Sequence, residues 1–132
     1  MKVILNKCFG GFHPSHEAYM RYAEKKGIQL FCYELTASHD YKKTQRGGIF
    51  SYYFMKDFGD TIKREDVDWN SMLRLSKDFR EDSTLIEVVE ELGEKASSGV
   101  SDLQVVEIPD GMKYVIDDYD GVETLHADVP TW

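Results

Sequence analysis

The sequence predicts an α+β fold, in which a mixed β-sheet carries about two helices on its surface. Two apolar segments flank a helical segment near the N-terminus, a pattern typical of a β-α-β unit. A second amphipathic helix is expected after residue 82, and short strands joined by turns predict a C-terminal β-meander. The chain has 132 residues, of which 42% are hydrophobic, which is enough for one globular domain over residues 1–132.

The N-terminal unit begins with Lys2–Cys8, which is apolar on both faces, as a central strand would be. Ser15 is placed to cap a helix over residues 16–26, and Gly27 is placed to end it. Ile28–Leu35 is again apolar on both faces. Because a helix of this length can return the chain, we expect Ile28–Leu35 to lie parallel to Lys2–Cys8. The helix should be buried through Ala18, Tyr19, Tyr22 and Ala23.

The middle of the chain is harder to assign. Residues 36–48 show no apolar period and many turn-forming residues, which predicts a flexible, exposed loop. Ile49–Phe58 is dense in aromatic residues and is predicted to be a strand whose side chains pack in the core. Residues 59–80 give no clear pattern.

The clearest helical pattern starts near Asp82 and Thr84, either of which can cap the helix. Gly93 either ends this helix or weakens it. The spacing of its apolar residues predicts a buried face made of Leu85, Val88, Val89 and Leu92. Its exposed face should carry Glu87, Glu90, Glu91 and Glu94.

The C-terminal part predicts strands at residues 103–108, 112–119 and 122–125, with a loose tail over residues 126–132. Asp120–Gly121 is a typical two-residue hairpin turn. Such a turn would place Asp118 directly opposite Glu123, where like charges repel. We therefore expect a longer loop that starts at Asp117, although a cation or a partner can also offset the repulsion.

Charge and composition exclude several classes of protein. The net charge of −8 disfavours nonspecific nucleic-acid binding. No apolar stretch approaches the roughly 18 residues of a membrane span. Residues 81–132 hold 2 Lys and Arg against 14 Asp and Glu, so this part either faces water or binds a partner with a basic surface. Cys8 and Cys32 form no CxxC pair, which favours reduced thiols in the cytoplasm.

Three stretches carry a resemblance to a known family: "LNKCFGGF", "LIEVVEELGEKAS" with "VVEIPDG", and "IDDYDGVE". Together they resemble a family of small, uncharacterised bacteriophage and prophage proteins. The resemblance covers the first 30 residues and roughly residues 78–126. It implies a phage protein that works in the host cytoplasm, where small acidic phage proteins often bind and block a host protein.

The loop between Lys7 and Ser15 is the first candidate site. Two adjacent glycines before a helix start allow close approach to an anion such as a phosphate, although the loop has neither the GxGxxG nor the P-loop pattern. Alternatively, the glycines only turn the chain. The candidate ligand-binding residues are Lys7, Cys8, Gly10, Gly11, Ser15 and, from the flexible loop, Arg46.

No catalytic or metal constellation stands out. The spacing of Cys8, His13, His16 and Cys32 is not a standard zinc pattern, and a Cys8–His13 nucleophile pair lacks a third, orienting residue. We therefore expect no cofactor and, as the leading hypothesis, a non-enzymatic phage accessory protein that modulates a host protein. Its candidate partner-binding residues are Glu87, Glu90, Glu91, Glu94, Asp117, Asp118 and Asp120. The alternative is a small-ligand protein that binds a nucleotide or another anion at the Lys7–Ser15 loop.

Overall fold

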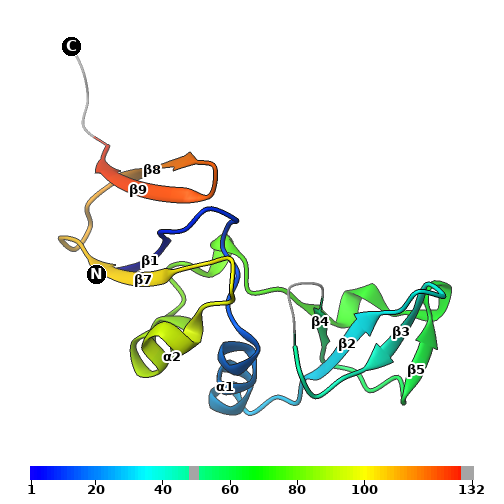
Figure 1. The fold of residues 1–132 in the computed structure, drawn as a ribbon. Helices are drawn as coiled ribbons and strands as arrows, with labels where there is room; N and C mark the ends of the chain where they lie inside the picture. The colour runs from blue at the N-terminus through cyan, green and yellow to red at the C-terminus, as the bar shows by residue number, and fades with distance from the viewer. Residues whose placement is uncertain (48–50, 129–132) are drawn as a thin grey trace.

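The fold was obtained as a computed structural model that describes residues 1–47 and 51–128 (Figure 1). It combines two α-helices and short 3-10 helices (η) with antiparallel sheets, which confirms the α+β class. In chain order the elements are β1 (Lys2–Asn6), α1 (His16–Lys26), β2 (Phe31–Leu35), β3 (Asp40–Lys43), β4 (Ser51–Phe54), β5 (Thr61–Lys63), η1 (Arg64–Asp66), η2 (Trp69–Ser71), β6 (Met72–Leu73), η3 (Lys77–Phe79), α2 (Ser83–Leu92), η4 (Gly93–Ala96), β7 (Leu103–Glu107), β8 (Tyr114–Tyr119) and β9 (Val122–Ala127).

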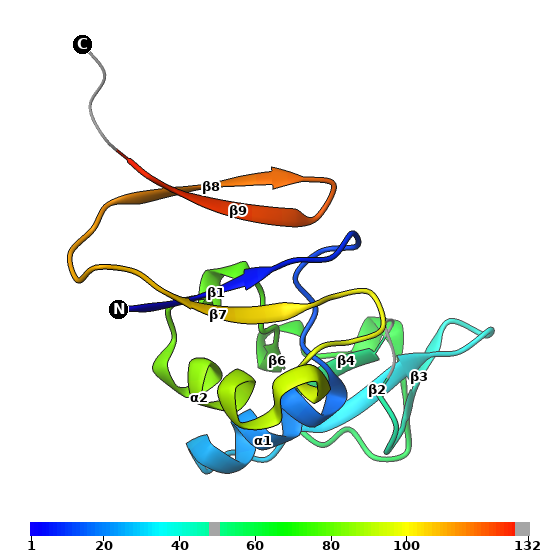
Figure 2. The same ribbon diagram turned by 60° about the vertical axis from the view of Figure 1, so that its left-hand side comes forward.

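Part of the chain forms three layers (Figure 2). The middle layer is the antiparallel pair β1–β7, with α1 and α2 on one face and the β8–β9 hairpin on the other. Ile4 belongs to the core cluster under the helices, and its neighbours Val3 and Leu5 belong to the cluster under the hairpin. Strand β1 is therefore apolar on both faces because both faces are covered.

The expected parallel pairing of the first two strands is wrong. Strand β1 pairs with β7, from the far end of the chain, and β2 lies in another sheet. Helix α1 does not return the chain to the first sheet, since it leads from the three layers into a separate lobe (Figure 1). The helix itself is as predicted: it spans residues 16–26, with Ser15 and Gly27 as caps, and it is buried through Ala18, Tyr19, Tyr22 and Ala23.

The lobe is a five-stranded antiparallel sheet in the order β5-β3-β2-β4-β6. It corrects the prediction of a flexible loop, since residues 40–43 form strand β3 and Tyr41 is only 4% exposed. The ring of Tyr41 packs edge-on against those of Tyr52 and Trp69, a tertiary contact that outweighs the turn-like local composition. Residue 48 of the predicted loop lies outside the described residues.

The aromatic strand is shorter than predicted, because β4 covers only Ser51–Phe54. Ile49 and Phe50 of the prediction lie outside the described residues. Core packing is confirmed for two of its aromatic residues: Tyr53 stacks on Tyr19 of α1 at 3.9 Å between ring centroids, and Phe54 is fully buried within the lobe. Residues 59–80, which showed no pattern, form short strands and 3-10 turns.

Helix α2 matches its prediction closely. Asp82 is the cap and accepts a hydrogen bond from the backbone N–H of Leu85, and Gly93 ends the helix. Leu85, Val88 and Val89 are buried and Leu92 is half-buried, whereas Glu87, Glu90, Glu91 and Glu94 are exposed. Within residues 1–47 and 51–128, no helix has the length and apolar character needed to cross a bilayer.

The predicted C-terminal meander is only partly formed. Strands β8 and β9 make a hairpin, but β7 pairs with β1 and not with β8 among the described residues. The longer loop from Asp117 is wrong, because Asp118 pairs directly with Glu123 across the two-residue turn. The expected loose tail also starts too early, since His126 and Ala127 belong to β9; residues 129–132 lie outside the described part.

Candidate functional site

The glycine loop between β1 and α1 is a structural turn. Gly10 and Gly11 have φ values of 119° and 99°, which side-chain-bearing residues rarely adopt. A Cβ atom on Gly10 would lie 2.6 Å from the carbonyl oxygen of Val100. A Cβ atom on Gly121, in the β8–β9 turn, would lie 2.7 Å from the backbone nitrogens of Gly10 and Gly11. The two turns therefore pack backbone against backbone, which confirms the structural interpretation of the glycines.

The side chains of Lys7 and Ser15 are already engaged within the protein. The Nζ atom of Lys7 donates to the carbonyl oxygen of Glu123 at 3.0 Å. The hydroxyl of Ser15 accepts from the N–H of Ala18 at 3.1 Å and donates to the carbonyl oxygen of Lys95 at 2.5 Å. Cys8 keeps a half-buried free thiol.

The structure does not bring the six predicted ligand residues into one cavity. Gly11 lines a cavity of about 260 Å³ together with Arg74 and Lys77, but Lys7, Ser15 and Arg46 are not among its described lining residues. Arg46 follows β3 in the lobe. This arrangement gives little support to an anion site built on the Lys7–Ser15 loop.

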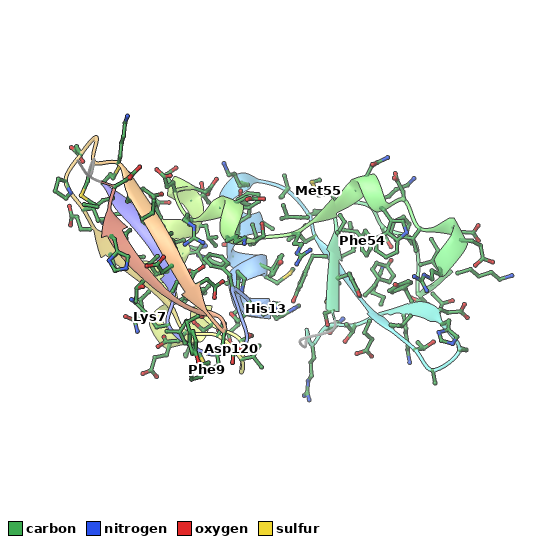
Figure 3. The ribbon with its side chains drawn as sticks, turned by 90° about the horizontal axis from the view of Figure 1, so that it is seen from above. Lys7, Phe9, His13, Phe54, Met55 and Asp120 are labelled. Atoms are coloured by element: carbon green, nitrogen blue, oxygen red, sulfur yellow. The ribbon has the colours of Figure 1, made fainter. Side chains whose placement is uncertain are left out.

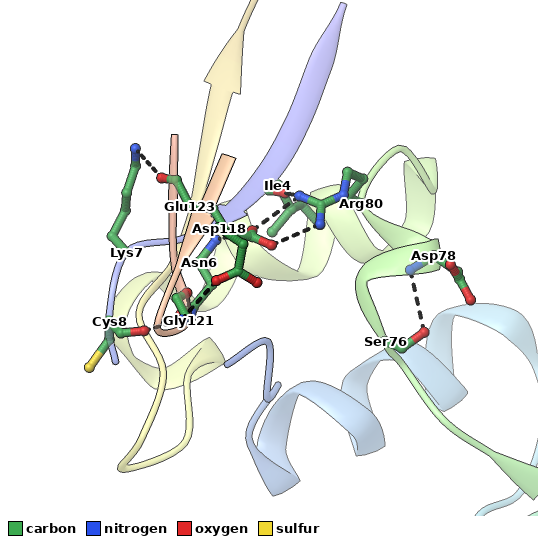
Figure 4. Close-up of polar contacts among 10 residues, drawn as sticks. All are labelled: Ile4, Asn6, Lys7, Cys8, Ser76, Asp78, Arg80, Asp118, Gly121 and Glu123. Carbon is green, nitrogen blue, oxygen red and sulfur yellow. Dashed lines mark hydrogen bonds and ion pairs between the residues drawn. The ribbon is translucent and has the colours of Figure 1, made fainter. Parts of the chain in front are cut away.

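A buried ion pair holds the hairpin against β1 (Figure 4). The guanidinium of Arg80 donates to both carboxylate oxygens of Glu123, at 3.1 and 2.9 Å, and to the carbonyl oxygen of Ile4 at 3.0 Å. Glu123 also accepts from the backbone N–H of Asn6 at 2.8 Å. The Asn6 side chain donates to the carbonyl oxygen of Gly121 at 2.6 Å. Among the described residues, no buried side-chain nitrogen or oxygen of this network lacks a hydrogen-bond partner.

The sequence did not predict this network. It favoured a longer loop from Asp117, and a two-residue turn with Asp118 opposite Glu123 and a cation to offset their repulsion was only the alternative. Arg80, which comes from the end of η3, is a cation bonded to Glu123. Asp118 instead turns to the hairpin, where its carboxylate accepts from the N–H of Gly121 at 2.8 Å. No local signal linked Arg80 to a strand 43 residues further along the chain.

The acidic face of α2 is largely neutralised by neighbouring basic residues. Arg21 and Lys25 of α1 form ion pairs with Glu91 at 2.9 and 3.0 Å. Lys2 of β1 bonds Glu90 at 2.9 Å, and Lys25 also lies 3.9 Å from Glu87. The hydrogen bonds from Lys25 and Arg21 hold the pKa of Glu91 below its usual range. Three of the seven predicted acidic residues, Glu87, Glu90 and Glu91, thus pair with basic residues of α1 or β1.

A groove with an acidic rim runs between α2 and β7, with a volume of about 600 Å³. Its apolar lining comes from Val89, Leu103 and Val105. Lys2 is the one basic side chain among the described lining residues, and it already bonds Glu90. The carboxylates that line the groove are Glu90, Glu94, Asp102 and Glu107. Two of these four, Glu90 and Glu94, were predicted from the sequence.

The hairpin carries the other predicted acidic residues at a separate place. Asp117 pairs with His126 at 2.8 Å, and Asp120 occupies the turn with a positive φ of 54°. Tyr119 is 80% exposed and Phe9 of the glycine loop is 61% exposed. Figure 3 shows Phe9 beside Asp120, at the end of the molecule where the two turns meet. The hairpin aspartates therefore do not join the glutamates of α2 in one surface.

A further cavity, of about 280 Å³, lies where the lobe meets α1. His16 bonds the hydroxyl of Tyr53 through Nδ1 at 2.9 Å, and burial lowers the pKa of His16. Burial also raises the pKa of Cys32, a buried thiol of β2 that is not among the described lining residues of this cavity. Within residues 1–47 and 51–128, no cluster of His, Cys, Asp and Glu is arranged to hold a metal ion.

Comparisons with protein-family models, with curated proteins and with solved structures return no match for this chain.

Proposed function

We propose that this protein is a non-catalytic binding protein that holds a basic segment of another protein in the groove between α2 and β7. The observation that carries the proposal is the charge of this groove, which has four carboxylates against one lysine. No ion pair within residues 1–47 and 51–128 engages three of these carboxylates, those of Glu94, Asp102 and Glu107. Asp102 accepts a hydrogen bond from the side chain of Gln104 at 3.0 Å, so Glu94 and Glu107 are the carboxylates best placed to meet lysine or arginine side chains of a partner.

The groove suits a protein partner better than a small ligand. Of its apolar lining residues, Val89 and Leu103 are buried and only Val105 is partly exposed, so the carboxylates of the rim dominate what a partner meets and select positive charge. Rim charges mainly accelerate association and set partner choice, so binding should weaken as salt rises.

The finer proposal concerns the biological setting. The resemblance to small bacteriophage and prophage proteins favours a phage accessory protein that modulates a host protein in the host cytoplasm. The acidic groove supports that reading, because it gives such a protein a surface for a basic host target.

A two-variant comparison tests the proposal. The bait Glu94→Gln/Glu107→Gln removes two groove charges, and the control Glu34→Gln/Glu65→Gln removes two exposed charges from the lobe. Carbodiimide cross-linking in bacterial lysate, followed by mass spectrometry, locates any partner lysine joined to a groove carboxylate. We expect a partner that the control bait retains and the groove bait loses. Equal retention by both baits refutes the groove as the binding surface.

A further inference from the structure

Strand β7 has an open edge along this groove. The bonds from Lys7 N–H to Asp102 O and from Ile108 N–H to Met1 O show that even-numbered residues of β7 bond β1. In an antiparallel pair the intervening residues point their N–H and C=O groups away from the partner strand. Val105 and Glu107 therefore direct their backbone groups outward, and no hydrogen bond among the described residues engages them.

The outer edge of β1 and the first residue of β7 are, by contrast, closed by hydrogen bonds. On the outer side of β1, Ile4 bonds Arg80 through both its N–H and its C=O, and the N–H of Asn6 bonds Glu123. At the start of β7, the N–H of Leu103 donates to the hydroxyl of Ser97 at 2.7 Å. The open part of the edge begins at Val105, where the groove lies.

We infer that the groove takes an extended, lysine- or arginine-bearing segment of the partner, which adds to β7 as a third strand of the β1–β7 sheet. This inference rests on the proposed function and specifies its binding mode. The segment would bond the backbone of Val105 and Glu107, because an unpaired strand edge is a template for pairing with another extended segment. Alternate side chains of the bound segment lie about 6.6–6.8 Å apart along it. These side chains would face Glu90, Glu94 and Glu107.

Charge selects this occupant over a second copy of the chain. Pairing β7 with β7 of another molecule would bring Asp102 and Glu107 near the same carboxylates, and like charges across a sheet are destabilising. A basic strand turns the same carboxylates into attractive partners. The acidic edge therefore disfavours pairing with a second copy through β7 and favours positively charged strands.

The test uses a capped heptapeptide of alternating valine and lysine. It is compared with N-methylated twins, which have the same sequence but carry a methyl group on alternate backbone nitrogens. Two twins, methylated in the two alternate registers, cover both possible orientations of the bonded edge. Methylation removes backbone donors but keeps every charge. We expect at least one twin to bind the full-length protein about tenfold or more weakly than the parent peptide, measured by calorimetry at low salt.

Amide hydrogen exchange supplies the second readout. The amides of Val105 and Glu107 should gain protection when the parent peptide binds. The amides of Gln104 and Val106, which already bond β1, serve as internal controls. If parent and twins bind equally and Val105 and Glu107 gain no protection, strand addition is overturned while the acidic groove stands. If no peptide binds, or if Glu94→Gln/Glu107→Gln leaves binding unchanged, the groove proposal fails and the inference falls with it.

Discussion

Replacing Arg80 by methionine should destabilise the protein more than any loss of a surface ion pair. The side chains of Arg80 and Glu123 are only 12% and 4% exposed. The change removes two hydrogen bonds to Glu123 and one to the carbonyl oxygen of Ile4. The buried carboxylate of Glu123 would then keep only the backbone N–H of Asn6 as a hydrogen-bond donor. Loss of one partner from a buried pair costs about 3–5 kcal/mol, so we expect a loss of that size in the free energy of unfolding.

The matched control is Arg21→Met, which breaks a pair with Glu91 whose side chains are 32% and 41% exposed. Exposed pairs contribute below about 1 kcal/mol. Urea unfolding with linear extrapolation measures both variants. The double variant Arg80→Met/Glu123→Gln should recover part of the loss, because it leaves no buried charge without a partner. The reasoning is refuted if Arg80→Met costs no more than Arg21→Met, or if the double variant is less stable than Arg80→Met.

Four further predictions concern the glycine turn, the buried face of α2, the groove and the ion pairs of α2. Gly10→Ala should lower the midpoint of thermal unfolding, since its φ is 119° and a Cβ atom would meet a carbonyl oxygen at 2.6 Å; an unchanged midpoint contradicts this. Leu85→Ala should cost about 2–5 kcal/mol in urea unfolding, as for other fully buried leucines, and a loss below 1 kcal/mol would contradict the assigned core face of α2. Lys2→Met should tighten binding of the valine–lysine peptide in calorimetry, because it frees Glu90 and removes the only described groove cation; weaker binding argues against the groove. Glu91 has a lowered pKa, so its ion pairs stabilise the fold above the ordinary carboxyl pKa of 4.5 and are lost as pH falls below it. Glu91→Gln should therefore flatten the acid limb of a stability–pH curve, and a curve identical to wild type would refute the role of these pairs.

The two helices illustrate what local sequence predicts well. Ser15 and Gly27 bound α1, and Asp82 and Gly93 bound α2, as their side chains and backbone freedom require. The buried faces of both helices also agree with their apolar spacing. Caps and helical periodicity depend on residues a few positions apart, so one sequence contains the information.

The candidate site was only half predictable for the opposite reason. The glutamates of α2 were visible in the sequence, but their neutralisation by Arg21 and Lys25 depends on how α1 packs against α2. Asp102 and Glu107 join Glu94 only because β7 crosses beside the end of α2. Likewise, Tyr41 belongs to a strand because aromatic rings from other elements cover it.

By itself, the sequence determined the helices and their caps, the glycine turn, the presence of a hairpin near Asp120–Gly121, and the excess of acid after residue 80. Tertiary structure alone decided that β1 pairs with β7, that Arg80 neutralises Glu123, and that one edge of β7 stays open beside an acidic groove. The physical reason is that strand partners are chosen by long-range packing. Strands β1, β2 and β7 are all apolar enough to pair, and only the layers of helices and hairpin around β1 select which of them meet.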